Sequence, residues 1–429
     1  MKNYFSLLLV LFSTCCYAQE RCGFSLGDKN KQRQNPNWIR QKAEFEYQIR
    51  EQQKNINGAN FRVEAKVYKI PVVVHVIHNN AANVIGGDNN SNISDEQIIS
   101  QIKVLNEDYR KKSGTNGYNT NAVGADMEIE FFLAYKDTLG NATNGITRTY
   151  VNVQNFDIIN GNQNIAKIIN WDSEKYLNIW VVRTNGATIG YSAFPYDSKL
   201  DGLDTKPTDL LSQEIFDGVI IDFHFFGTCC AVTNQTYNLG RTTTHEVGHW
   251  LGLLHPTEND TPCGNDFCDD TPQIESLNLS TNCNKISSVC SGIQRVNMIE
   301  NYMDYSPDRC MNIFTNDQKT RTRAALDLSF KRKKLINSID PLPETEKLMI
   351  SVEPNPSKNS SFIRAQFKGQ KDFKISVWDF KGMLMYEETY ESQMSSFFAI
   401  KSDKLRSGEY IVRVVVGDET ATQKIIVEK

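Results

Sequence analysis

The sequence predicts an α+β domain followed by a small antiparallel β-sandwich. Between residues 66 and 338, β-branched apolar runs alternate with stretches of helical periodicity, which is typical of α/β or α+β domains. From residue 348 to 429, short alternating strands are separated by turn residues, as in small β-sandwiches. Two prolines and an acidic run in residues 339–347 indicate a linker between the two domains.

Residues 1–18 have the pattern of a secretory signal peptide. Lys2 gives a positive start, an apolar core follows over residues 5–12, and Ala18 supplies a small residue at the expected cut. The core is too short to span a bilayer, and no other long apolar run follows. A buried N-terminal helix is the alternative interpretation. We therefore expect a protein that is secreted, or attached to the cell surface, with no transmembrane segment in the mature chain.

The net charge of −4 gives the chain no general basic character, so nucleic acid is not an expected partner. Residues 19–65 are polar and rich in Gln, Asn, Lys and Arg, which indicates a pro-segment or a loosely packed leader. Residues 38–53 could form a helix, although the apolar face of that helix is thin.

The elements of the main domain follow from periodicity. A continuous β-branched run over residues 67–77 predicts a buried strand. Ser94, with Gln97 three positions on, resembles a capping box that opens a helix reaching Tyr109. The remaining expected elements are strands over 127–135, 177–182 and 218–222, a helix over 165–171, and a final helix that carries the chemistry.

That final helix leads into the pattern H-E-x-x-H-x-x-G-x-x-H. A helix turns roughly 100° per residue, so His245 and His249 lie on one face and their rings can converge on one ion. Gly252 can end the helix in a left-handed conformation and bring in His255 as a third nitrogen ligand. Three protein ligands leave a position open for water, which marks a catalytic rather than a structural zinc site.

Glu246 lies beside these ligands, where it can act as the catalytic base. Zinc lowers the pKa of its water to about 7 and polarises the scissile carbonyl. Glu246 would take the proton of the water and pass it to the leaving amine. A bare H-E-x-x-H also occurs by chance, but the extended pattern takes three of the six histidines of the chain. The other three lack ligand spacing and are expected to be ordinary strand or loop residues: His75, His78 and His224.

The extended motif is that of the metzincin zinc proteases, and Asn301–Tyr305 resembles their Met-turn. The cysteines and acidic residues over 263–311 make the chain resemble the pappalysin (cytophagalysin-like) family in particular, over residues 66–335. The resemblance implies a secreted metalloendopeptidase acting on proteins or peptides, with a twisted mixed sheet, an active-site helix and backing helices. It also implies that Met303 forms a hydrophobic floor beneath the zinc and that Tyr305 stabilises the oxyanion.

The same resemblance implies two overlapping disulfides, Cys263–Cys290 and Cys283–Cys310. It further implies a calcium site, because oxygen ligands on a tight acidic loop suit a hard cation. The implied ligands are Asp266, the carbonyl of Asp269, and Thr271. The alternative for this loop is a solvated acidic turn.

Cys22 stands in an Arg-Cys-Gly segment that partly matches a pro-region motif of the family. A thiolate is a strong zinc ligand, so Cys22 would hold zinc in a latent form. The alternative is a disulfide to Cys229, Cys230 or Cys268. Adjacent Cys229 and Cys230 rarely bridge each other. A bridge from one of them to Cys268 is the better interpretation, and the choice between them stays open.

Family members that prefer Arg or Lys after the cut carry an acid in the primed pocket, near the cysteine that follows the Met-turn. Here Asp308 is close to Cys310, but Arg309 lies between them. The sequence therefore gives this preference only weak support.

The end of the chain resembles a type A C-terminal sorting domain of type IX secretion, on residues 352–356, 377–382, 405–412 and 424–429. The resemblance implies the type IX secretion machinery as a partner and removal of this domain on release. A generic β-sandwich binding domain is the alternative. For the whole protein, the alternative is a surface adhesion or binding protein with a structural zinc, against which Glu246 and Tyr305 argue.

Overall fold

The computed structural model describes residues 20–35, 37–58, 66–141, 143–186, 188–195, 215–257, 261–338, 345–357, 361–369, 371–393, 396–400 and 405–428. The expected signal peptide lies outside these residues, and so do residues 339–344 of the expected linker.

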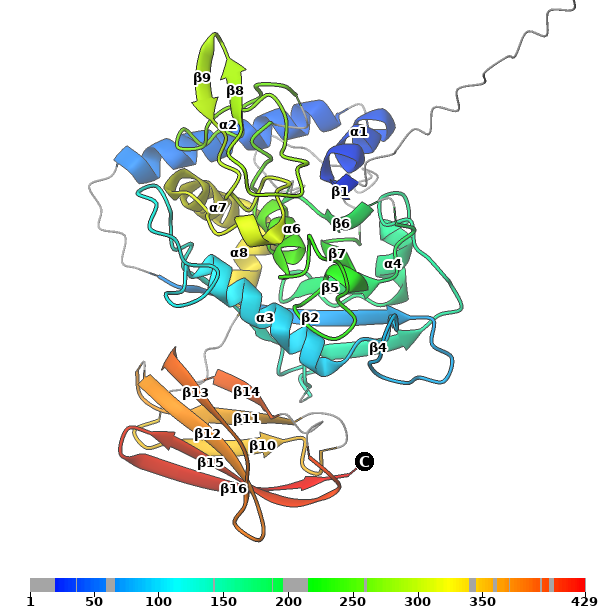
Figure 1. Cartoon of the computed structure of the whole chain (residues 1–429), viewed down its shortest axis with the longest axis vertical. Coiled ribbons are helices and arrows are strands. Elements are labelled where there is room, and N and C mark those ends of the chain that lie inside the picture. The colour runs from blue at the N-terminus through cyan, green and yellow to red at the C-terminus, as the bar shows by residue number, and fades with distance from the viewer. Residues whose placement is uncertain are drawn as a thin grey trace, which may run out of the picture.

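A seven-stranded mixed sheet forms the centre of the main domain (Figure 1). Its strands are β1 (Glu20–Cys22), β2 (Tyr68–His78), β3 (Ile129–Leu133), β4 (Ile146–Tyr150), β5 (Leu177–Val182), β6 (Thr188–Ser192) and β7 (Gly218–Asp222). The order is β1-β6-β7-β5-β2-β3, with β4 also paired to β2. Every pair is parallel except β6 with β7, which are antiparallel. The mixed sheet and its helices confirm the α+β prediction.

The central strands are buried because both faces of the sheet are covered. All residues of β5 and β7, and all but Lys69 in β2, are buried, as continuous apolar strands of parallel sheets require. One face packs against helices α3 (Asp95–Tyr109) and α6 (Arg241–Trp250), and α4 (Asn162–Ile168) lies against the other. The hydroxyl of Ser94 accepts the N–H of Gln97 and caps α3 as the sequence predicts.

Four further helices complete the main domain and its leader. Helices α7 (Asn316–Leu328) and α8 (Phe330–Asn337) follow α6, so the zinc-motif helix is not the last of its domain. Helix α1 (Phe24–Gln34) and the long α2 (Trp38–Gly58) belong to the leader. The leader is not loosely packed: α2 lies along α7 (Figure 1) and buries three large apolar residues against Ala324 and Ala325. Those residues are Trp38, Phe45 and Ile49.

The C-terminal residues form two packed antiparallel sheets around their own apolar core. One sheet has the order β10-β11-β14 and the other β13-β12-β15-β16. The strands are β10 (Met349–Glu353), β11 (Ser361–Gln366), β12 (Lys371–Asp379), β13 (Leu384–Gln393), β14 (Ser396–Ile400), β15 (Gly408–Val416) and β16 (Glu419–Val427). This is the expected β-sandwich.

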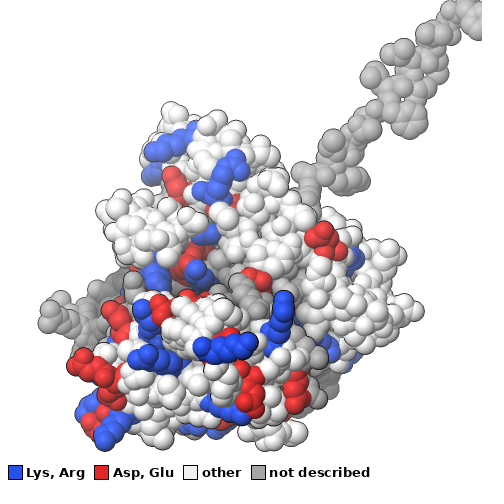
Figure 2. All heavy atoms as spheres, turned by 60° about the horizontal axis from the view of Figure 1, so that its bottom comes forward, with Lys and Arg blue, Asp and Glu red and all other residues white. Residues whose placement is uncertain are grey.

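On the face drawn in Figure 2, basic and acidic side chains are interspersed, and neither charge forms a large patch of its own. Among the described residues, helices long and apolar enough to cross a membrane are absent.

Candidate active site

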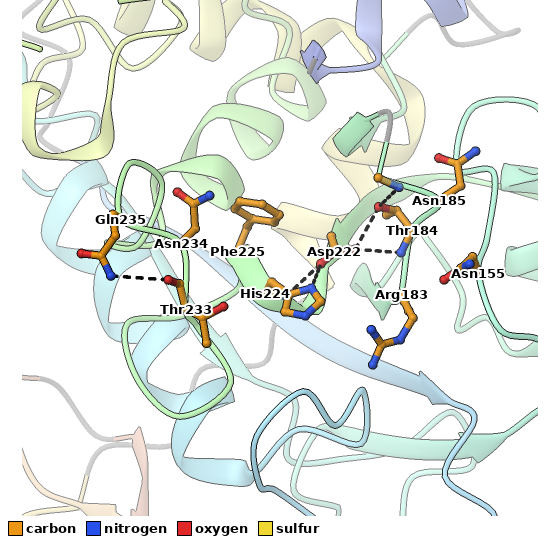
Figure 3. Close-up of a pocket in the computed structure, with 11 residues that line it drawn as sticks. Asn155, Arg183, Thr184, Asn185, Asp222, His224, Phe225, Thr233, Asn234 and Gln235 are labelled. Carbon is orange, nitrogen blue, oxygen red and sulfur yellow. Dashed lines mark hydrogen bonds and ion pairs between the residues drawn. The ribbon is translucent and has the colours of Figure 1, made fainter. Parts of the chain in front are cut away.

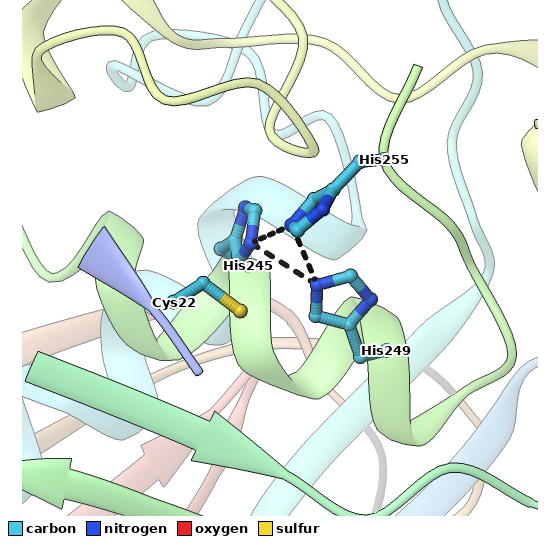
Figure 4. Close-up of side chains that lie close together, drawn as sticks. All are labelled: Cys22, His245, His249 and His255. Atoms are coloured by element: carbon cyan, nitrogen blue, oxygen red, sulfur yellow. Dashed lines mark hydrogen bonds between the residues drawn. The ribbon is translucent and has the colours of Figure 1, made fainter. Parts of the chain in front are cut away.

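The three histidines of the motif converge in the fully buried centre of the main domain (Figure 4). Their Nε2 atoms lie 3.1 Å (His245 to His255), 3.2 Å (His249 to His245) and 3.1 Å (His249 to His255) apart. Two nitrogens bound tetrahedrally to one zinc at about 2.0–2.1 Å would be separated by about 3.3–3.4 Å. Three acceptor nitrogens facing one point have no proton to share, so this donor set fits a cation.

Backbone contacts fix how these rings point. The Nδ1–H of His245 donates to the carbonyl of Tyr302 at 2.7 Å, and that of His249 donates to the carbonyl of Leu253 at 2.8 Å. These bonds leave the Nε2 lone pairs free to bind metal. Burial lowers the pKa of all three imidazoles, to about 3 for His255, so they are neutral, which is the form that ligates.

The turn after α6 brings His255 to the other two rings. Gly252 has a left-handed φ of 93°, as the motif predicts. A Cβ at Gly252 would lie 2.7 Å from the Cβ of Ala325 in α7, so close packing also requires glycine. The Nε–H of Arg321, also in α7, donates to the Gly252 carbonyl at 2.7 Å. The turn is therefore held by the helix that follows the motif.

A buried carboxylate connects α3, α6 and the Met-turn. Asp108 accepts hydrogen bonds from the hydroxyl of Tyr302 (2.8 Å), the hydroxyl of Thr244 (2.7 Å) and the guanidinium of Arg241 (3.1 Å). Burial raises the pKa of Asp108 to about 6, against the opposing effect of Arg241 and the two hydroxyls. Through Tyr302, Asp108 supports the carbonyl that orients His245.

Cys22 occupies the fourth corner of the histidine cluster (Figure 4). Its Sγ and the ligand nitrogens of the three histidines all lie within 4.8 Å of one another. Strand β1 carries Cys22 there by pairing parallel with β6, so that Cys22 is opposite Gly190. Phe24 stacks on His249 with ring centroids 4.1 Å apart. The leader therefore enters the site as an added strand.

Glu246 is fully buried beside Cys22 and Gly190. A Cβ at Gly190 would lie 2.6 Å from Oε1 of Glu246, so the strand makes room for the carboxylate. Burial raises the pKa of Glu246 to about 8, while a hydrogen bond with Cys22 and the charge of Arg21 oppose the shift. A cation at the histidines would favour the ionised form.

Met303 and Tyr305, the two Met-turn residues that the resemblance singles out, are both buried beside the zinc motif. Met303 is buried under α6, and a Cβ at Gly248 would be 2.5 Å from its Sδ. The ring of Tyr305 is 5.0 Å from that of His255. Its hydroxyl donates to the backbone carbonyl of Cys22 at 3.3 Å.

Arg21, beside Cys22, fills a buried pocket next to the histidines. Its guanidinium pairs with Asp308 at 3.2 Å and donates to the carbonyl of Ser306 at 2.8 Å. It also lies over the ring of Tyr237, 4.8 Å from the centroid. Arg309 instead donates to Thr281 at the surface. The sequence singled out Asp308 but not its partner, and Arg309 does not reach the pocket.

The loop from residue 263 carries the two disulfides that the resemblance implies, Cys263–Cys290 and Cys283–Cys310. Thr271 donates its hydroxyl to both carboxylate oxygens of Asp266, at 2.8 and 2.7 Å. Asp269, whose carbonyl is the third implied ligand, donates its backbone N–H to Asp317. The structure thus brings two of the three implied calcium ligands into contact.

The expected bridge from Cys229 or Cys230 to Cys268 is wrong. Cys229 and Cys230 are joined to each other, and Cys268 is buried outside any disulfide. Cys230 has a left-handed φ of 67° and contacts Ser94 at the start of α3, whereas Cys268 packs beside Asp266. Cys230 and Cys268 therefore lie in different loops with different neighbours. Their spacing in the sequence gives no sign of this.

The other histidines behave as expected of ordinary residues. His75 and His78 are buried in β2, and His75 contacts Thr147 and Asn178. His224 lies in a short 3-10 helix (Phe223–Phe225), where its Nδ1 is 2.8 Å from Asp222. Sequence reasoning missed the contacts of Arg21, Gly190 and Asp108, and neither Gly190 nor Asp108 belongs to a motif. The Arg before Cys22 was the one available signal.

The mixed sheet, the convergent histidines and the Met-turn define a metallopeptidase of the metzincin type. Residues 160–327 match the family described as pregnancy-associated plasma protein-A, and residues 351–428 match the secretion system C-terminal sorting domain. An extracellular metalloprotease of Neurospora crassa is 32% identical over 157 residues, 37% of this chain and 50% of the relative. Extracellular metalloprotease 1 of Coccidioides posadasii is 30% identical over 233 residues, which are 53% of this chain and 68% of the relative. The chain spans about half the length of the first curated relatives it matches.

Two solved structures resemble the fold closely. A promirolysin mutant of Tannerella forsythia has a TM-score of 0.60 and 32% identity, covering 75% of this chain and 99% of that one. Mature mirolysin of the same organism, in complex with a cleaved peptide, has a TM-score of 0.53 and 35% identity. The match covers 64% of this chain and 98% of that one. The chain belongs to the pappalysin family of metalloproteases and carries a C-terminal sorting domain.

Proposed function

We propose that the chain is the precursor of a secreted, zinc-dependent endopeptidase that cleaves proteins or peptides. The observation that carries the proposal is the convergence of three buried, neutral histidines beside the buried carboxylate of Glu246. Three ligands and a neighbouring carboxylate suit hydrolysis, whereas a structural zinc site fills all four positions with permanent protein ligands. Cys22, the fourth group here, belongs to the leader.

The residues of the site have distinct roles in this proposal. Zinc at the three histidines would polarise the scissile carbonyl and increase the acidity of the attacking water. Glu246 would accept the proton of that water and deliver it to the leaving nitrogen. Tyr305, whose hydroxyl reaches the Cys22 carbonyl, would donate to the developing oxyanion. The edge of β6, once β1 has left, would align an extended substrate by backbone pairing.

The pocket of Arg21 supports a preference for a basic residue after the scissile bond. Asp308 and the Ser306 carbonyl accept from the guanidinium, and Tyr237 stacks on it. A substrate Arg or Lys would meet the same acceptors after the leader leaves. A buried carboxylate without a cationic partner is costly, so the pocket would discriminate against apolar side chains.

The leader would hold the enzyme latent through two adjacent residues, Cys22 at the metal and Arg21 in the basic pocket. Together they would block the position of the attacking water and the pocket for the residue after the scissile bond. A substrate could then enter only after residues 19–65 have left. In the precursor, Cys22→Ala should release activity before the leader is cleaved. Continued latency in that variant would show that the thiol is not required.

The central test is Glu246→Ala in enzyme freed of its leader. Casein or gelatin should be cleaved by the unchanged enzyme, and the variant should lose cleavage while still binding about one zinc per chain. Cleavage retained by the variant would overturn the mechanism. Zinc binding without any turnover by the unchanged enzyme would favour the alternative of an adhesion protein with structural zinc.

A calcium ion at the 263–271 loop is a second part of the proposal. Burial raises the pKa of Asp266 to about 7, with hydrogen bonds from Thr271 and the Cys268 N–H opposing the shift. A divalent cation would stabilise this carboxylate in its charged form. For the C-terminal residues, we propose recognition by the type IX secretion machinery. Deleting residues 348–429 should retain the protease inside the cell.

A further inference from the structure

A polar hollow of about 590 Å³ lies between the loop that precedes β6 and the loop that precedes α6 (Figure 3). One wall is formed by residues 233–235, and the opposite wall by Asn155 and residues 183–186. Asp222 and His224 lie between the two walls. None of these residues belongs to the zinc site.

The first wall continues directly into the pocket of Arg21. Asn234 accepts the backbone N–H groups of Thr236 and Tyr237, each at 2.7 Å. Tyr237 is the ring on which Arg21 stacks, and the Thr236 carbonyl accepts the N–H of Asp308 at 3.0 Å. The loop that bounds the hollow therefore also carries Tyr237, which forms one side of the pocket that holds Arg21.

The opposite wall continues into the strand that holds the leader. Asn185 stands three positions before Thr188, which pairs with Glu20 of β1. Three residues of chain span at most roughly 10 Å, so the hollow lies near the end of β6 that pairs with Glu20. Both walls therefore connect the hollow to the Arg21 pocket, one through Tyr237 and the other through the start of β6.

The floor of the hollow is hydrogen-bonded through Asp222, and its lining is polar. Buried Asp222 accepts the N–H and the hydroxyl of Thr184, at 2.7 and 2.9 Å, and the N–H of His224 at 2.9 Å. The guanidinium of Arg183 is engaged by Asn89 and lies over Phe223. The side chains of four amide residues also line the hollow: Asn155, Asn185, Asn234 and Gln235. Amides donate and accept hydrogen bonds, as a peptide backbone does.

We propose that this hollow is an extended substrate subsite, which binds the polypeptide roughly three to five residues after the scissile bond. It rests on the proposed peptidase function and on a basic residue occupying the Arg21 pocket. Its ligand is an extended, hydrophilic peptide segment, held through backbone carbonyls, N–H groups and neutral polar side chains. Substrates that end just after the basic residue do not reach it.

The test compares two peptides that share one sequence up to the basic residue and continue for one or for five further polar residues. Leader-free enzyme should cleave the longer peptide with a kcat/KM roughly tenfold higher, the scale of one or two net hydrogen bonds. Asn155→Ala combined with Asn185→Ala should reduce that ratio at least threefold. Asn170→Ala, an exposed asparagine after α4, is the matched control and should keep the wild-type ratio.

A binding measurement separates this proposal from the proposed activity. Fluorescence anisotropy on leader-free Glu246→Ala protein should give the same preference for the longer peptide in Kd. Equal Kd values for the two peptides, or an unchanged ratio in the double variant, overturn the subsite. Failure to cleave either peptide, with the Kd preference intact, overturns the proposed peptidase function instead.

Discussion

The guanidinium of Arg21 lies 3.2 Å from the carboxylate of Asp308, and each side chain is only 1% exposed. The other carboxylate oxygen of Asp308 accepts the backbone N–H groups of Leu239 and Arg241 at the start of α6. One residue therefore joins the leader, the basic pocket and the helix that carries two zinc ligands. Its location between these three parts has a direct consequence for specificity.

Asp308→Asn should remove the preference for basic substrates. The amide oxygen can still accept from Leu239, but the pocket loses its negative charge. In leader-free enzyme, kcat/KM for a peptide with Arg after the cut should fall roughly 100-fold, the scale of a broken buried charge pair. The matched peptide with norleucine should change little. If both peptides lose activity equally, Asp308 supports α6 and does not select the substrate.

Glu46→Gln should loosen the leader. Glu46 in α2 pairs with Arg321 at 2.7 Å, both are buried, and Arg321 also holds the Gly252 turn. Breaking such a pair costs roughly 3–5 kcal/mol, so the precursor should melt earlier and be activated faster by limited proteolysis. Glu51→Gln on the same helix, an exposed pair with Lys54, is the control and should have little effect.

Tyr302→Phe should weaken zinc binding without touching a ligand. It removes the hydroxyl that donates to Asp108 and so loosens the carbonyl that orients His245. Zinc affinity in chelator competition should fall roughly 10- to 100-fold. Tyr305→Phe is the matched variant, expected to lower kcat while zinc affinity is kept. Equal zinc affinity in both variants would contradict the role of Tyr302.

Asp217 should make stability depend on pH in the acid range. Burial alone would raise its pKa, but Arg332 at 2.7 Å and Lys331 at 3.4 Å hold it below the usual range. The unfolded chain, with a pKa of about 3.9, then binds more protons, so this stabilisation is complete above about pH 4 and is lost as pH falls further.

Asp217→Asn tests that dependence, since it leaves Arg332 buried without its charged partner. At pH 7 the variant should be less stable by roughly 3–5 kcal/mol. The difference in Tm between the two proteins should shrink as calorimetry is repeated below pH 4. A difference that stays constant with pH would show that the carboxylate charge is not what stabilises the fold.

Calcium removal should destabilise the disulfide-bonded loop. With free calcium at 100 times its Kd, binding contributes about 2.7 kcal/mol, so a calcium-selective chelator should lower Tm. Asp266→Asn should abolish this response. Asp269→Asn should keep it, because only the backbone carbonyl of Asp269 is an expected ligand. An unchanged Tm in chelator would remove calcium from the proposal.

The predictions that agree best with the structure are those that rest on local sequence patterns. Strands β5 and β7 coincide with the predicted runs, and the Ser94 cap is present, because burial and capping act on neighbouring residues. The leader was misjudged for the opposite reason. The apolar face of α2 is thin. Its burial depends on α7 and on the ion pair of Glu46 with Arg321, which are 275 positions apart in the sequence.

The sequence by itself determined the metal site, because helical geometry and one glycine turn bring three histidines within eleven positions to one point. Only the tertiary structure decided what covers that point. Arg21 and Asp308 are 287 positions apart, and β1 meets β6 through the pairing of an exposed sheet edge. No spacing along the chain encodes such contacts, since they form where packed elements happen to bring complementary groups together. The vicinal bridge of Cys229 with Cys230 is different, because it joins neighbours at a local backbone turn in which Cys230 has a left-handed φ of 67°.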